Sequence, residues 1–139
     1  MASEEELLMS GSRIVLCLLA VLMGCGGNPL GSEADARKHF AAEMTKWMAG
    51  QQSQVKTIDG IGKVFPVRYD IRSVLPDEPD LFAHAEGKDI SPNSKSFPAY
   101  RFNVAIEQKS ERGTPLETLA TYTVTFNTDE QRWYARERH

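Results

Sequence analysis

The sequence has little of the chemistry that active sites usually need. Its 139 residues include two cysteines and three histidines, His39, His84 and His139. It contains neither a Gly-x-Ser-x-Gly nucleophile elbow nor a His-Glu-x-x-His zinc helix. A metal needs three or four convergent ligands, and His84 with nearby acidic residues would supply them only if its loop folded back. We therefore expect a protein that is not an enzyme and holds no metal or other cofactor.

Strong positive charge and a long apolar run are also missing. The net charge is −3, from 16 basic and 19 acidic residues. A nucleic-acid binder needs a concentrated basic surface, so we expect no nucleic-acid partner. The longest apolar run covers the ten residues Ile14 to Met23. A transmembrane helix needs about 20 such residues, so this run is too short to span a bilayer.

The apolar run has the layout of an export signal, with Arg13 before it and the small residue Gly24 after it. The stretch Leu22-Met23-Gly24-Cys25 resembles the lipobox of bacterial lipoproteins. This resemblance implies that residues 1–24 are a signal peptide and that Cys25 is acylated after cleavage. The lipid bilayer would then be a partner through Cys25, in the cell membrane or outer membrane, with the chain facing the periplasm or the exterior.

One observation qualifies this interpretation. The first eight residues carry Glu4, Glu5 and Glu6, whereas such signals are normally basic, so the true start is expected at Met9. A plain secretory signal and a buried helix ending at Gly24 are the alternatives. Residues 25–31 are rich in glycine and predict a flexible tether. The mature chain would keep a single thiol, so it could form no internal disulfide.

Residues 32–139 predict one α+β domain. A helix is expected from Ser32 to Gly50, with Ser32 as the cap and Asp35 three residues later. One face of this helix is apolar, with residues at three- and four-residue spacing: Ala36, Phe40, Met44, Trp47 and Met48. Charged residues lie off that stripe: Arg37, Lys38, Glu43 and Lys46.

Three or four strands are expected to follow as an antiparallel meander. Apolar residues alternate with polar ones in three segments: 67–72, 100–107 and 120–126. Residues 132–138 predict a last strand, with Trp133 in the core and Arg132, Arg136 and Arg138 on a solvated face. Gln108 to Pro115 is expected to be a linker. The single helix would cover the apolar face of the sheet and leave the other face polar, which gives two layers.

This order of elements resembles cystatin-like and nuclear-transport-factor-like domains. The inhibitory signature of cystatins, Gln-x-Val-x-Gly, is absent from this sequence. Protease inhibition therefore does not carry over with the resemblance.

The segment from Leu75 to Pro98 contains four prolines and an acidic cluster in 24 residues. Loops of this length are functional or disordered. One interpretation is a loop tucked onto the domain, with Leu81-Phe82-Ala83 docked on its surface. The other is a partner-contact loop with five candidate residues: Asp77, Glu78, Asp80, Leu81 and Phe82.

The sequence favours a membrane-anchored envelope lipoprotein with a small binding or scaffolding domain. Its partner would be an envelope protein that the sequence does not identify. The alternative is a small ligand carrier or enzyme, which would need a cavity of roughly 300 Å³ between helix and sheet. Homodimerisation through the polar sheet face or a strand edge is a third hypothesis. Anionic lipid headgroups are an alternative partner for the arginines of the last strand.

Overall fold

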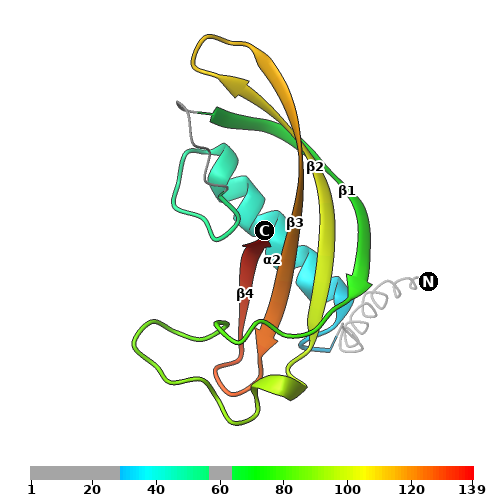
Figure 1. Cartoon of the computed structure of the whole chain (residues 1–139), viewed down its shortest axis with the longest axis vertical. Helices are drawn as coiled ribbons and strands as arrows, with labels where there is room; N and C mark the ends of the chain where they lie inside the picture. Colours follow the sequence, from blue (N-terminus) through cyan, green and yellow to red (C-terminus); the bar gives the residue numbers. More distant parts are fainter. Residues whose placement is uncertain (1–28, 57–63) are drawn as a thin grey trace, which may run out of the picture. The chain divides into compact units, whose positions relative to one another are not determined.

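One helix and four strands make up the part of the chain that the computed structural model describes, residues 29–56 and 64–139. In chain order the elements are α2 (Glu33–Met48), β1 (Val64–Pro76), the short 3₁₀ helix η1 (Ser94–Ser96), β2 (Ala99–Ser110), β3 (Pro115–Asn127) and β4 (Arg132–Arg138) (Figure 1). The expected signal peptide and Cys25 lie outside the described residues. The expected α+β fold, one helix on an antiparallel meander, is confirmed.

Helix α2 begins where the sequence predicts. The Ser32 hydroxyl accepts a hydrogen bond from the Asp35 amide at 3.1 Å, which satisfies one of the free N–H groups of the first turn. The Asp35 carboxylate accepts in turn from the Gly31 amide at 3.3 Å and from the Trp133 indole at 2.6 Å. The helix start is thereby joined directly to β4.

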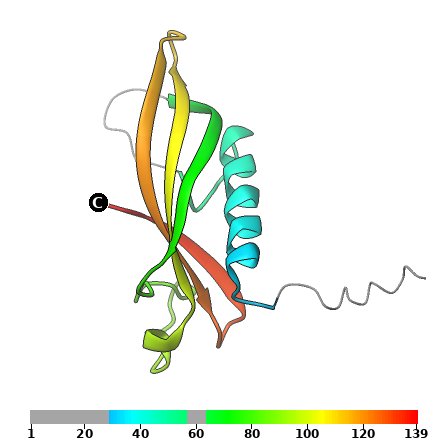
Figure 2. The same cartoon turned by 90° about the vertical axis from the view of Figure 1, so that its right-hand side faces the viewer.

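The four strands form one sheet in the order β1-β2-β3-β4, and each neighbouring pair is antiparallel. Helix α2 lies on one side of this sheet (Figure 2). Between them Phe40 is fully buried, with its ring centroid 4.8 Å from Phe102 and 5.2 Å from Tyr122. The Tyr122 hydroxyl donates to the Val55 carbonyl oxygen at 2.8 Å. Aromatic side chains therefore fill the interface between helix and sheet.

The apolar stripe of α2 is confirmed at four of its five positions, and Met48 is the exception. Met48 is exposed because it occupies the last position of the helix, beyond the end of the buried face. Glu43, expected on the charged face, is instead 4% exposed. Its carboxylate accepts from Lys46 Nζ and from the Gln54 amide, both at 2.9 Å. These contacts tie the segment after the helix to α2 and offset the cost of burying the charge.

Strand β1 departs from simple alternation at two places. The pairing with β2 shifts between Pro66 and Arg68, and again between Ile71 and Ser73. A bulge adds a residue to one strand and changes which face the next side chains occupy. Val67, expected on the apolar face, is therefore 45% exposed, whereas Val74 packs against the core. The expected linker from Gln108 to Pro115 is half strand, because β2 continues to Ser110 and β3 begins at Pro115, with the turn between them.

The loop from Asp77 to Pro98 crosses in front of the lower ends of the strands, whereas α2 lies behind them (Figure 1). The Asp80 amide donates to the Thr125 hydroxyl at 3.1 Å, and the Asn127 side-chain amide donates to the Ala83 carbonyl oxygen at 2.8 Å. Thr125 is fully buried as a result. The sheet face expected to be solvated is thus partly covered by this loop.

Candidate functional site

A surface cavity of about 560 Å³ lies where this loop meets the polar face of the sheet. All five residues predicted for a partner-contact loop line it: Asp77, Glu78, Asp80, Leu81 and Phe82. The remaining lining comes from Pro79 and from four residues of the strands: Arg101, Thr123, Arg136 and Arg138. Its volume lies within the range of about 300–1,000 Å³ that is typical of ligand pockets.

Strand register places the basic residues of the cavity. Arg101 of β2 pairs with Thr123 of β3, and Thr123 pairs with Arg136 of β4. Residues paired across neighbouring strands point to the same face of a sheet, with strands about 4.8 Å apart. The three side chains therefore form one row across the sheet. Arg138 lies two residues beyond Arg136 and shares its face.

Asp77 organises one side of the cavity. Its side chain is 6% exposed, and its carboxylate accepts four hydrogen bonds. The donors are Arg138 Nη1 at 2.9 Å, Thr123 Oγ1 at 2.9 Å, Arg101 Nη2 at 3.3 Å and the Glu78 amide at 2.8 Å. Burial alone would raise the pKa of Asp77. The hydrogen bonds and the charge of Arg138 outweigh burial, so its pKa lies below the ordinary value.

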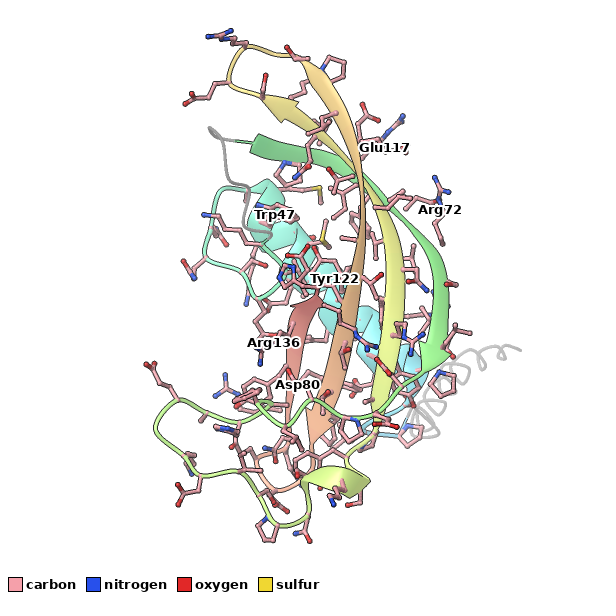
Figure 3. All side chains as sticks on the ribbon, viewed as in Figure 1. Trp47, Arg72, Asp80, Glu117, Tyr122 and Arg136 are labelled. Carbon is pink, nitrogen blue, oxygen red and sulfur yellow. The ribbon has the colours of Figure 1, made fainter. Side chains whose placement is uncertain are left out.

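The other side of the cavity has a different arrangement. The guanidinium of Arg136 lies over the ring of Phe82, 4.7 Å from the ring centroid. Its Nη1 is 3.6 Å from Asp80 Oδ1, and these two residues lie close together in Figure 3. The same Asp80 oxygen accepts from the Phe82 amide at 3.0 Å. Of the segment Leu81-Phe82-Ala83, expected to dock on the domain, Ala83 is buried, whereas Leu81 is 47% and Phe82 63% exposed.

Donor groups in this cavity remain available to an acceptor. The contact between Arg136 Nη1 and Asp80 Oδ1 is longer than a hydrogen bond. Asp80 therefore attracts Arg136 by its charge without accepting a hydrogen bond from it. Arg101 Nε is buried, and within residues 29–56 and 64–139 no acceptor reaches it. The Asp77 carboxylate already accepts four hydrogen bonds, so it is not a free acceptor for these donors. The cavity therefore combines a fixed ion-pair cluster around Asp77 with the exposed guanidinium of Arg136.

The three histidines lie apart from this cavity. His39 is half-buried beside the helix stripe, with Nε2 2.9 Å from Gln54 Oε1. His84 Nδ1 is 3.1 Å from the Ala85 carbonyl oxygen, and His139 is exposed. Among the residues described, no group of three or more His, Cys, Asp or Glu side chains could hold a metal ion.

Sequence reasoning found the acidic loop but not its partners. The composition of the loop pointed to Asp77 and Asp80, whereas Arg101 and Thr123 appeared as ordinary polar positions of strands. Arg136 and Arg138 were assigned to a solvated face. Placing them in one cavity requires the register of three strands and the path of the loop, and only the alternation pattern was visible in the sequence.

Among the residues that the structure describes, no helix has both the length and the apolar character needed to cross a bilayer. Comparisons with protein-family models, curated proteins and solved structures return no match for this chain. The fold and the cavity therefore define the chain only as a two-layer α+β domain with a charged surface cavity.

Proposed function

We propose that this chain is a lipid-anchored envelope lipoprotein whose α+β domain binds another envelope protein. Acylated Cys25 holds the domain at a cell membrane or outer membrane, and the domain acts by binding rather than by catalysis. The lipobox-like stretch Leu22-Met23-Gly24-Cys25 supports the anchor. The cavity between the loop and β4 is the observation that carries the binding function.

Three features of the cavity suit a protein partner. Its rim presents the exposed side chains of Leu81 and Phe82. Phe82 is paired with Arg136, and aromatic residues and arginine are the types that dominate the energy of protein interfaces. Two hydrogen bonds hold the loop to β3, one donated by the Asp80 amide and one accepted by the Ala83 carbonyl oxygen. The loop would therefore lose little conformational freedom on binding.

The packing of α2 disfavours the alternative of a ligand carrier or enzyme with a pocket between helix and sheet. Phe40, Met44, Phe102 and Tyr122 are each completely buried there. Their side chains occupy the space that a carried ligand would need. The binding surface is therefore on the opposite face of the sheet.

Site-specific photo-crosslinking in the native envelope tests this function. A photoreactive residue at Leu81 should capture one defined protein, and Arg136→Gln should abolish the capture. A photoreactive residue at Leu119 is the control, because Leu119 is 75% exposed but does not line the cavity. Equal capture from both positions, or capture that is unchanged in the Arg136→Gln variant, would contradict the proposal. Cys25→Ser should reduce capture by releasing the domain from the membrane.

A further inference from the structure

The chemistry of the cavity specifies what the partner presents, if the proposed binding function holds. We infer that the cavity takes a carboxylate side chain of the partner, with an apolar neighbour of that carboxylate resting against Phe82. Arg136 is the contact for the carboxylate.

Arg138 and Arg101 are both committed to Asp77, at 2.9 and 3.3 Å. This fixes the geometry of two guanidinium groups before any ligand arrives. Arg136 is held less tightly, since its Nη1 is 3.6 Å from Asp80 Oδ1, beyond hydrogen-bond distance, and its side chain is 57% exposed. A planar guanidinium with open donors matches a carboxylate in two parallel hydrogen bonds.

The acidic residues of the cavity limit the charge of the ligand. Asp77, Glu78 and Asp80 line the same hollow as the three arginines. A phosphate dianion or an anionic membrane surface would bring several negative charges against Glu78 and Asp80, which is unfavourable. A single carboxylate brings one charge, which Arg136 can compensate.

The apolar part of the ligand follows from the rim. The ring of Phe82 has one side covered by Arg136 and is otherwise largely exposed, and Leu81 beside it is 47% exposed. Covering this apolar surface is favourable, and a leucine or phenylalanine next to the acidic residue would cover it. The ligand is therefore a short protein segment with an acidic residue beside an apolar one.

The test uses the full chain in zwitterionic detergent micelles and follows the Arg136 side chain and the Phe82 ring by NMR. The probe is the peptide acetyl-Gly-Leu-Glu-Gly-amide, and its matched control carries Gln in place of Glu. The Glu peptide should shift both signals, and the Gln peptide should bind at least about tenfold more weakly. This comparison needs no protein variant, so it does not depend on how a variant folds.

Two variants complete the test. Arg136→Gln should weaken binding of the Glu peptide at least about tenfold. Arg132→Gln removes the same charge from the same strand but outside the cavity, since Arg132 stacks on Tyr134, and should leave binding unchanged. Equal binding of the two peptides, no binding of either, or equal effects of the two variants would overturn the inference.

Separate arms of the test distinguish other anions and the proposed function itself. Inorganic phosphate or phosphatidylglycerol that shifts Arg136 while the Glu peptide does not would assign the site to phosphate and overturn the inference. If crosslinking from Leu81 captures a partner but the Glu peptide fails, the inference alone is wrong. If the peptide binds but no partner is captured in the envelope, the proposed function is wrong.

Discussion

Replacing Asp77 by Asn tests the role of this buried carboxylate in holding the loop to the sheet. The change keeps the shape of the side chain but removes its charge and presents an amide to four hydrogen-bond donors. Thr123, 6% exposed, would keep a poorer partner, and an unsatisfied buried polar group costs about 1–3 kcal/mol. Asp77 also forms ion pairs with Arg101 and Arg138, whose side chains are 40% and 47% exposed. Each of these exposed ion pairs contributes only about 0–1 kcal/mol. We expect Asp77→Asn to lower the free energy of unfolding by about 2 kcal/mol at neutral pH.

The effect of Asp77→Asn should depend on pH in a defined direction. In the folded protein the pKa of Asp77 lies below its ordinary value of 3.8, so folding favours the ionised form. Its stabilising contribution is complete above the ordinary pKa and disappears as the pH falls through the lower, folded pKa. The difference in unfolding free energy between wild type and Asp77→Asn should therefore shrink as the pH falls from about 6 to about 2.

Urea unfolding of the chain from Cys25 onward, followed by the fluorescence of Trp47 and Trp133, measures both quantities. Asp70→Asn is the control. Asp70 is 72% exposed and pairs with the exposed Arg72 at 2.8 Å, so its loss should change stability by less than about 0.5 kcal/mol. A difference between wild type and Asp77→Asn that stays constant from neutral to acid pH would refute the reasoning, because it would mean that the charge of Asp77 contributes nothing.

Three further predictions concern the core, the strand edge and the anchor. Trp47→Ala should lower the free energy of unfolding by roughly 3–5 kcal/mol, and an unchanged thermal midpoint would show that α2 does not pack as described. Gln54→Ala removes the side-chain oxygen that accepts from the Ala135 amide at 2.8 Å and contacts His39. It should lower the free energy of unfolding by about 1–2 kcal/mol and speed hydrogen exchange at Ala135, and unaltered exchange would contradict this. Cys25→Ser should move the protein from the detergent phase to the aqueous phase or stall its processing, and an unmodified Cys25 in the mass of the native protein would disprove the anchor.

The helix and the cores of the strands could be predicted because their signals are local. Ser32 and Asp35 mark the start of α2 within four residues, and spacing alone identifies its buried face. Alternation identifies Phe102, Val104 and Ile106 as inward-facing residues, and all three are buried. Such patterns depend only on the geometry of one element, so one sequence suffices to find them.

The bulges and the long hairpin could not be predicted because they depend on pairing between strands. Val67 looks like a core residue until a register shift turns it outward. The polar residues after Glu107 resemble a linker, yet Thr118 donates to Gln108 Oε1 at 2.8 Å across the hairpin. On the outer face of the same region Arg68 donates to Glu107 at 2.6 Å. Cross-strand pairs of this kind stabilise strands that composition alone assigns to loops.

The candidate site was half predicted for the same reason. Its acidic half lies in one continuous segment, where proline content and length marked it as unusual. Its basic half comes from three strands, and no short stretch of sequence contains it. A charge cluster assembled by a sheet becomes visible only when the register is known.

In the function proposed above, the stability of the loop and the binding of a partner depend on different residues of one cavity. Asp77 contacts Arg101, Arg138, Thr123 and the Glu78 amide, whereas Arg136 contacts Asp80 and Phe82.

The two groups share no hydrogen-bond or ion-pair partner among the described residues, so we expect their effects on stability to add. The double variant of Asp77→Asn and Arg136→Gln should therefore lose the sum of the two single losses, within about 0.5 kcal/mol. Urea unfolding of the four proteins measures this sum. A larger coupling energy would show that the cavity behaves as one network, so that a partner bound at Arg136 would also change the stability of the loop. Additive losses would mean that binding can be removed through Arg136 while the domain keeps its fold.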